Sequence, residues 1–559
     1  MTDFILALHS HLPYVLNHGR WPHGSDWLCE AALDTYLPLI EALSTLERAG
    51  VSAPVTIGVT PVLANQLVNP AFAAEMETFI AQRLAACDEA HVSLATTGDA
   101  HLVPLAGFWR ERFLHLRELF RSLGGNIVAV LRDLEGRGRI EIMGSAATHG
   151  FLPLLGRDES IQLQLALGQA EHRRLFGRAP KGCWLPECAY RPRGAWEPLP
   201  GARRAAVRPG TDEHLATAGF RYFFTDANLA EAGVPLGASS DVPLGAERFD
   251  SERHDVSVQK LTETGKRSPY HAYRMAGALA RSVAAFVRDP RSSMQVWSKQ
   301  KGYPGDPWYL EFHKIRPDGL KYWRVTGPVD LGAKRPYEPA AAQGRASEHA
   351  RHFASLLAST AVSTRGNGPG VIVSPFDTEL FGHWWFEGVD FIQALYGRLK
   401  GQTVVRPVTA ALHLDEHPPR TTVRLSAGSW GANGDWSMWL NDQTERLWRR
   451  LWALEDAFWD AAPAALASES ARPVLAQAAR ELLLAQASDW QFMISTGAVT
   501  DYAERRFALH CDDAERLVAA LAPGAGVGAL EAAQRVAEEL RRRDDLFPDV
   551  LTSVATALG

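Results

Sequence analysis

The sequence lacks the features that mark membrane-spanning, secreted and nucleic-acid-binding proteins. No apolar run approaches the length of a membrane span, and the first residues, MTDFILALHSHLP, have neither the basic region nor the long apolar core of a signal peptide. Lysine and arginine form no block, and the formal net charge is -6 at pH 7. We therefore expect no nucleic acid and no membrane among the partners of this protein.

Cysteine is scarce, with five residues in a chain of 559. An odd, scattered set of thiols argues against a disulfide framework and favours a reducing cytoplasm. Cys183 and Cys188 lie close together but have no second Cys/His pair at a zinc spacing, so we interpret them as core residues. We expect a soluble cytoplasmic protein that uses no metal ion and no other cofactor.

Tryptophan, in contrast, is abundant, with 17 copies. Many of these rings can simply fill a large core. Several, however, lie in polar, glycine-rich stretches such as SWGANGDWSMW at residues 429–439, which are poor core sequences. For that subset we favour flat rings that line a groove and stack on a bound partner.

Short β-rich runs alternate with helical patterns along most of the chain. This alternation indicates a parallel sheet, either open or closed into a barrel. Seven strand candidates favour a slightly incomplete (β/α)7 barrel over an open doubly wound sheet. The candidates are FILALH (4–9), PVTIGVT (54–60), RIEIMG (139–144), KGCWLPE (181–187), RYFFTD (221–226), MQVWS (294–298) and PGVIVSPFD (369–377).

Two stretches interrupt the alternation within a predicted catalytic barrel of residues 1–420. Residues 61–136 are mostly helical and too long for one crossover, which predicts an inserted helical subdomain. Residues 227–291 carry little regular pattern until the helical stretch AGALARSVAAFV, and a long irregular segment after a barrel strand is often a functional lid. Residues 421–559, helical from about 440 onward, are expected to form a C-terminal domain that completes the substrate cleft.

Two histidines, His9 and His11, end the first predicted strand in LHSHLPY. Residues two apart on a strand point to the same side, so both rings face one site. Such a pair can bind a metal ion or can hydrogen-bond to a ligand rich in hydroxyl groups. His149 and His383 are the other clear histidines at strand ends, and no cluster has a usual zinc spacing, so we favour contact with a sugar.

Two carboxylates close predicted barrel strands. Glu187 ends the fourth strand in GCWLPECAY, and Asp377 ends the seventh in SPFDTELFGHWW. Two carboxylates that face each other across a site can cleave a glycosidic bond, one as nucleophile and one as acid/base. A structural ion pair is the plain alternative, but no basic residue lies beside either one at 183–189 or 373–381. Glu379 is a rival to Asp377, which we prefer because the apolar run ends there.

Five ordered motifs, HSHLPYV, ATHGFLP, WLPECAY, SPFDTELFGHWWFEG and LLLAQASDWQFM, resemble those of glycoside hydrolase family 57. Within that family the closest resemblance is to the 1,4-α-glucan branching enzymes, and it spans nearly the whole chain. The resemblance implies a (β/α)7 barrel with a helical insertion and a helical C-terminal domain. It also implies a retaining mechanism, with Glu187 as the nucleophile and Asp377 as the acid/base.

The resemblance further assigns substrate contacts, with an α-glucan as the partner. In branching members a loop tyrosine helps to cover the site, and Tyr270 in SPYHAYR is the candidate here, although the loop carries an insertion ahead of it. Ala498 stands where related enzymes can carry a glutamine. The predicted contact residues are His9, His11, Trp21, His149, Tyr270, Arg288, Trp297, Gly305, Trp430 and Asp489.

Three other functions remain open on the sequence. Within the same family, the chain could be an α-amylase or a 4-α-glucanotransferase, because hydrolysis and transfer differ only in the acceptor. A metal-dependent hydrolase or deacetylase that uses His9 and His11 comes from another class. A catalytically weak glucan-binding protein is the last, and the retained Glu187 and Asp377 speak against it.

Overall fold

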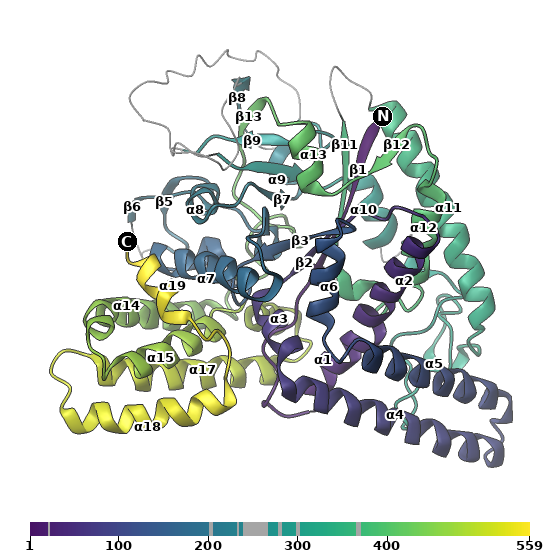
Figure 1. The fold of residues 1–559 in the computed structure, drawn as a ribbon, viewed down its shortest axis with the longest axis horizontal. Coiled ribbons are helices and arrows are strands. Elements are labelled where there is room, and N and C mark those ends of the chain that lie inside the picture. Colours follow the sequence, from purple (N-terminus) through teal and green to yellow (C-terminus); the bar gives the residue numbers. More distant parts are fainter. Residues whose placement is uncertain are drawn as a thin grey trace.

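A computed structural model describes residues 1–20, 23–200, 205–231, 234–238, 267–277, 282–297, 302–364 and 370–559 (Figure 1). Trp21, one of the predicted contact residues, lies outside the described residues, as does most of the predicted lid at 227–291.

The core of the molecule is a parallel sheet of seven strands within the described residues. The strands are almost fully buried, which explains why they read as continuous apolar runs rather than alternating ones. In spatial order they are β11 (Val371–Asp377), β1 (Thr2–Ser10), β2 (Val55–Val59), β3 (Ile140–Ser145), β4 (Gly182–Trp184), β7 (Tyr222–Thr225) and β10 (Ala284–Val287).

The two outer strands of this series meet. The backbone N–H of Asp289, just after β10, donates to the carbonyl oxygen of Val373 in β11 at 2.8 Å. The sheet therefore curls almost into a closed (β/α)7 barrel, as predicted. Four further strands, β9 (Tyr273–Met275), β13 (Thr421–Arg424), β8 (Val234–Ala238) and β12 (Val405–Pro407), extend the sheet, and β5 (Gly194–Trp196) and β6 (Ala205–Arg208) form a separate pair.

The predicted sixth strand was wrong. Residues 294–297 belong to helix α10 (Pro290–Trp297), and the strand is β10 (Ala284–Val287), inside the stretch AGALARSVAAFV that was not predicted as a strand. The side chain of Asp289 accepts hydrogen bonds from the backbone N–H groups of Arg291 and Ser292, at 3.1 and 3.0 Å. An Asp-Pro start is a helix N-terminal signal, and it outweighs the β preference of the short run that follows.

Helices cover the barrel (Figure 1). The region 61–136 forms α3 to α6, in which α4 and α5 make a long antiparallel pair that projects from the barrel. The helices that precede the C-terminal part are α1 (Ser25–Ala31), which continues through a π-helical turn into α2 (Leu37–Arg48), α3 (Pro61–Val68), α4 (Pro70–Thr96), α5 (Val103–Ser122), α6 (Ile127–Gly136), α7 (Asp158–Phe176), α8 (Thr211–Ala218), α9 (Ala227–Glu231), α10, α11 (Pro339–Ser363), α12 (Gly388–Leu399) and α13 (Ala410–Glu416).

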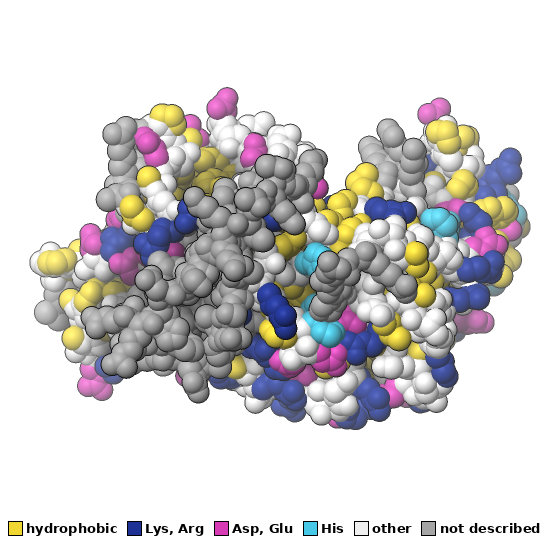
Figure 2. All heavy atoms as spheres, turned by 90° about the horizontal axis from the view of Figure 1, so that it is seen from above, with side chains coloured by type: hydrophobic (Ala, Val, Ile, Leu, Met, Phe, Trp, Pro, Cys, Tyr) yellow, Lys and Arg dark blue, Asp and Glu magenta, His cyan; other side chains and the backbone are white. Residues whose placement is uncertain are grey.

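The C-terminal part of the chain is helical and packs against the barrel beside α7 and α3 (Figure 1). Its helices are α14 (Glu445–Ala467), α15 (Arg472–Ala485), α16 (Asp489–Thr496), α17 (Thr500–Leu521), α18 (Val527–Arg543) and α19 (Val550–Ala557). None of the helices among the described residues is both long enough and apolar enough to cross a membrane. On the face in Figure 2, basic side chains lie among acidic ones over the described surface and form no single block.

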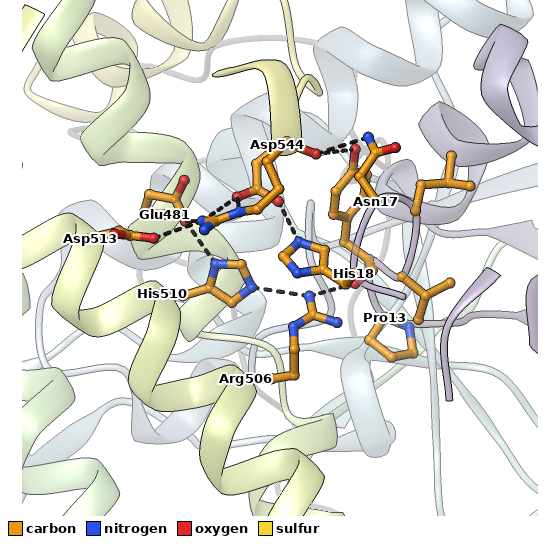
Figure 3. Close-up of polar contacts among 12 residues, drawn as sticks. Pro13, Asn17, His18, Glu481, Arg506, His510, Asp513 and Asp544 are labelled. Carbon is orange, nitrogen blue, oxygen red and sulfur yellow. Dashed lines mark hydrogen bonds and ion pairs between the residues drawn. The ribbon is translucent and has the colours of Figure 1, made fainter. Parts of the chain in front are cut away.

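A buried polar cluster joins these helices to the loop after β1 (Figure 3). His18, on that loop, contacts Asp544 at 2.6 Å, and His510 on α17 contacts Glu481 on α15 at 2.7 Å. Arg506 donates to the carbonyl oxygen of Tyr14 at 2.6 Å. The loop that follows β1 is thus held by side chains from α17 and from the segment after α18.

Charge balance within the cluster depends on Arg543, whose guanidinium contacts Asp544 at 2.6 Å and Asp513 at 2.7 Å. Burial alone would raise the pKa of Asp544, but the hydrogen bond from His18 and the nearby positive groups hold it below its ordinary value. Asp544 is therefore a buried carboxylate that stays ionised because its partners stay in place.

We expect Asp544→Asn to lower the free energy of unfolding by about 1–3 kcal/mol, because a buried carboxylate that accepts from His18 and pairs with Arg543 is lost, while Arg543 keeps its contact with Asp513. Since the pKa of Asp544 is lowered in the folded protein, this stabilisation is present above about pH 4 and is lost as the pH falls. Urea denaturation at several pH values measures it. Asp545→Asn is the matched control, because the Asp545 side chain is 62% exposed and should change stability little.

Candidate active site

A cavity of about 1280 Å³ opens at the carboxyl ends of the barrel strands. Barrel residues line one side of it, the start of α1 and the middle of α4 another, and α16 with the segment before α14 a third. Both predicted carboxylates line this cavity. The site therefore lies at the edge of the sheet where parallel-barrel active sites are built.

Glu187 enters the cavity from a strained turn after β4. Its backbone has φ 60° and ψ 21°, and the next residue, Cys188, has φ 49°. Residues other than glycine rarely adopt this left-handed backbone conformation. The backbone strain that it causes persists only where the surrounding structure enforces it. The backbone N–H of Trp430 donates to the Glu187 carbonyl at 3.1 Å, which helps to hold the turn.

The Glu187 carboxylate receives a hydrogen bond on each oxygen. The Trp430 indole N–H donates to Oε2 at 2.9 Å, and the Ser488 hydroxyl donates to Oε1 at 3.2 Å. Burial raises the pKa of Glu187 to about 7, and these two hydrogen bonds oppose that rise. Glu187 is thus ionised above neutral pH, as a nucleophile must be.

Asp377 is the last residue of β11 and pairs in register with His9 of β1. Burial raises its pKa well above the ordinary value, and the negative charges of Glu379 and Glu187 raise it further. Asp377 makes no hydrogen bond to another described residue, and the positive charge of Arg288 opposes the rise only in part. A protonated carboxyl beside an ionised one is the pairing expected of a glycosidic acid and nucleophile.

Glu379 also lines the cavity, but it is tied to the protein frame. Its Oε1 accepts hydrogen bonds from the Tyr36 hydroxyl and from the His11 backbone N–H, the latter at 3.2 Å. Burial raises the pKa of Glu379 to about 7. These contacts favour a supporting role for Glu379 and leave Asp377 as the better candidate acid.

Three histidines form a stack beside the carboxylates. The rings of His9, near the end of β1, and His11, just after it, lie 6.0 Å apart and nearly parallel, as residues two apart on an extended chain should. His149, which has φ 60°, stacks on His11 at 4.0 Å, and its Nε2 lies 3.0 Å from Nε2 of His9. His11 Nε2 contacts Asp489 at 3.0 Å. Burial lowers the pKa of His9 and of His149 well below the ordinary value, so both are neutral.

His11, His149 and Asp489 each offer a possible metal-ligand atom within 4.8 Å of the others. The rings of His11 and His149, however, are stacked with 19° between their planes. In stacked imidazoles the nitrogen lone pairs run side by side and do not converge, whereas zinc needs each nitrogen to point at it from about 2.0–2.1 Å. Both His149 nitrogens already face His9 and Ser488, at 3.0 Å each. These residues do not fit a zinc ion.

Other predicted contact residues also line the cavity, namely Arg288, Trp297, Trp430 and Asp489. Arg288 is paired with Asp226 at 3.0 Å. Asp489 begins α16, so the C-terminal helices reach the centre of the site. The structure therefore brings these four together with the carboxylates and histidines, from positions spread along the chain.

Two predicted contact residues lie away from the cavity. The carbonyl of Tyr270 accepts from the N–H of Val371, the first residue of β11, and its hydroxyl donates to buried Asp289 at 3.1 Å. Tyr270 thus lies toward the opposite end of the strand that carries Asp377, which contradicts its prediction as the lid tyrosine. Gly305 is exposed in a short turn, Tyr303–Gly305, and does not line the cavity either. The positions of Tyr270 and Gly305 could not be predicted, because the loops that carry them have no periodic sequence pattern.

Several residues of the cavity were not singled out from the sequence. Ser488 precedes Asp489 in a quoted motif, but a lone serine carries no pattern. Trp384, Phe492 and Ile315 are 41%, 42% and 50% exposed, and all three line the cavity. Exposed large apolar side chains inside a cleft are suited to stacking on sugar rings. The double tryptophan in FGHWW was the available signal for the first of them.

Comparison with known proteins agrees with this geometry. The model of glycosyl hydrolase family 57 matches residues 5–426, and a model described as 1,4-alpha-glucan branching enzyme, C-terminal, matches residues 451–554. A 1,4-alpha-glucan branching enzyme of Thermococcus kodakarensis is 39% identical over 98% of this chain and 77% of that protein. Its crystal structure, in complex with glucose and additives, has a TM-score of 0.85 at 38% identity and covers 99% of this chain and 96% of that one.

Two further crystal structures are similar over nearly their whole length. A branching enzyme of the same family from Pyrococcus horikoshii has a TM-score of 0.85 at 36% identity, covering 99% of this chain and 96% of that one. An α-amylase from Thermotoga maritima has a TM-score of 0.77 at 28% identity and covers 99% of each chain. The family model covers most of the barrel and the similar structures cover nearly the whole chain, so the chain belongs to glycosyl hydrolase family 57.

Proposed function

We propose that this protein is a 1,4-α-glucan branching enzyme, which cleaves α-1,4 linkages in a glucan and forms α-1,6 linkages. One observation carries the proposal. The region that matches the branching enzyme C-terminal model contributes Asp489, Phe492 and Met493 to the same cavity as Glu187 and Asp377. Similar proteins that match this chain over nearly its whole length are named branching enzymes.

The first half of the reaction breaks the α-1,4 bond. The ionised carboxylate of Glu187 attacks the anomeric carbon, and protonated Asp377 gives its proton to the departing O4. The donor chain is then joined to Glu187 through an ester, and the shortened glucan leaves with its new hydroxyl group. The environments of the two carboxyls suit these roles, because Glu187 has two hydrogen-bond donors and Asp377 has none among the described residues.

The second half forms the branch. Asp377, now ionised, takes the proton from the 6-hydroxyl of an acceptor glucose, whose oxygen attacks the anomeric carbon and releases Glu187. Two inversions retain the α configuration. Asp377 ends protonated and Glu187 ends ionised, so the site is ready for another donor. Water in place of the 6-hydroxyl would give hydrolysis instead.

The remaining cavity residues position the sugar. The His11–Asp489 pair lines the cavity beside Glu187 and offers hydrogen-bonding atoms to the sugar, and the neutral rings of His9 and His149 pack beside His11. Trp430 and Trp297 offer faces for stacking. We place the reaction in the synthesis of a glycogen-like polymer in the cytoplasm. All five cysteines are unpaired and buried, which is compatible with a reducing compartment.

An α-amylase activity is the second candidate. It is favoured by the similarity to the Thermotoga maritima α-amylase and by the position of Tyr270, which does not cover the cavity. Hydrolysis and branching share the first half of the reaction, so the choice between them lies with the acceptor.

Proton NMR of amylose incubated with the purified protein tests the proposed function directly. We expect α-1,6 anomeric signals to grow while the number of reducing ends stays nearly constant. Glu187→Gln should abolish both changes while the fold is retained, since the nucleophile is lost and the shape is kept. Growth of reducing ends without α-1,6 signals would show a hydrolase, and an active Glu187→Gln protein would remove Glu187 from the mechanism.

The choice of Asp377 over Glu379 as acid/base can be tested by chemical rescue. Asp377→Asn should reduce cleavage of glucan by about 100- to 10,000-fold, because the leaving oxygen is no longer protonated. With an aryl maltooligosaccharide, whose leaving group needs no proton, added azide should restore turnover and yield the α-glycosyl azide. Glu379→Gln is the matched control and should show no azide rescue. If azide rescued Glu379→Gln and not Asp377→Asn, Glu379 would be the acid/base and Asp377 the supporting residue.

The pH dependence of cleavage follows from the same carboxyls. Because Glu187 has a pKa of about 7 and must be ionised, kcat/KM should fall about tenfold per pH unit below neutrality. Because the pKa of Asp377 is raised, its proton is retained into the neutral range and activity should be lost only at higher pH. Cleavage of an unmodified maltooligosaccharide, whose leaving oxygen needs the proton of Asp377, measured from pH 5 to 10 checks both limbs. A flat profile between pH 5 and 7 would contradict the role of Glu187.

A further inference from the structure

Ser488 is the one hydroxyl group among the described residues that donates to the Glu187 carboxylate, and no sequence motif marked it for this role. It stands at the corner between α15 and α16, with its Oγ 3.2 Å from Glu187 Oε1 and 3.0 Å from His149 Nδ1. We propose that Ser488 is a positioning residue that links a pair of neutral histidines to the nucleophile and holds Glu187 in its ionised form. The proposal rests on the proposed function only in taking Glu187 as the nucleophile.

Glu187, Ser488, His149 and His9 form a series of hydrogen bonds in which each donor can be identified. Ionised Glu187 can only accept, so the single proton of the Ser488 hydroxyl is used toward Oε1. The Ser488 oxygen must then accept from Nδ1–H of His149. A neutral histidine carries one ring proton, so Nε2 of His149 is an acceptor and must be met by Nε2–H of His9, 3.0 Å away. The ionised state of Glu187 therefore fixes the tautomers of both His149 and His9.

The surroundings of His9, at the other end of this series of hydrogen bonds, agree with that direction. In the assigned tautomer, His9 Nδ1 carries a lone pair and no proton. That atom is buried and has no hydrogen-bond partner among the described residues, and it faces Gly58. If Glu187 were protonated on Oε1, each hydrogen bond in the series would run the other way. Nδ1 of His9 would then carry a buried N–H with no partner among the described residues. Buried N–H groups without a partner are rarer in proteins than unpaired acceptors.

The position of Ser488 is set by the backbone rather than by a mobile side chain. Its N–H donates to the carbonyl of His149 at 3.1 Å, and Gly150 forms an isolated antiparallel bridge with Ala487. Gln164 of α7 donates to the side chain of Gln486 at 2.9 Å, next to the same corner. The segment with His149 in its strained φ and the segment with Ser488 therefore hold each other in register.

Other charged groups also face Glu187. The negative charge of Asp489 of α16 opposes ionisation of Glu187, as does that of Asp377 of β11 whenever it is ionised, whereas His11, just after β1, favours it. His149, after β3, lies 3.8 Å from Oε1 but is neutral. Trp430 donates to Oε2 and Ser488 to Oε1. Ser488 is therefore one of two neutral donors that favour the charged form of Glu187, and the one that connects it to the histidines.

Ser488→Ala tests the proposal, with cleavage of an aryl maltooligosaccharide followed as kcat/KM against pH. Loss of one hydrogen bond to a buried carboxylate should move the acidic limb up by about one pH unit, so that kcat/KM at pH 6 falls about tenfold. At the top of the profile the change should be much smaller. Ser488→Thr, which keeps the hydroxyl, should return the limb toward its original position.

Ser495→Ala is the matched control, because Ser495 is on the same helix and accepts from Asn441 at 2.8 Å without touching Glu187. Its acidic limb should stay where it is. If Ser488→Ala lowers kcat/KM equally at all pH values, or leaves the profile unchanged, Ser488 has no role in holding the charge of Glu187 and the proposal is overturned. The readout is cleavage, so it is independent of whether the enzyme then forms α-1,6 linkages.

Discussion

The burial of two carboxyl groups in one cavity is the constraint on which the rest of this site depends. Burial raises the pKa of both Glu187 and Asp377, and their charges also repel each other. Left to themselves, both groups would be protonated and the site would hold two acids and no nucleophile. The fold places hydrogen-bond donors on Glu187 and, among the described residues, none on Asp377. This unequal distribution of donors, rather than any difference between the two side chains, separates the roles.

Delivering those donors requires parts of the chain that are far apart in sequence. Trp430 comes from the segment before α14 and Ser488 from the start of α16, while Glu187 itself sits on a strained turn after β4. Strain of this kind needs support from its surroundings. The C-terminal helices give that support at the site, and the cluster around Asp544 fixes the same helices to the loop after β1. Barrel and helices therefore behave as one structural unit around the cavity.

Much of this could be predicted from the sequence because it depends on local pattern. Apolar runs predicted six of the barrel strands. Because the carboxyl ends of parallel strands meet at one edge of the sheet, the polar residues at those ends predicted a site with Glu187, Asp377 and the histidines. The sixth strand was misplaced because two short apolar runs compete there and the Asp289 cap decides between them. Tyr270 and Ser488 were beyond prediction for a different reason. Their roles depend on which residues lie opposite them in space, and an aperiodic loop or a lone hydroxyl carries no sign of that.

The contact between Ser488 and Glu187 also has a consequence for how the enzyme comes into being. The two residues are 301 positions apart, and a ribosome releases the barrel strand with Glu187 well before the helix corner with Ser488. Until that corner docks, the carboxyl of Glu187 lacks one of its donors and its strained turn lacks its support. The hydrogen bonds that the nucleophile needs are therefore complete only after the last helices have docked on the barrel.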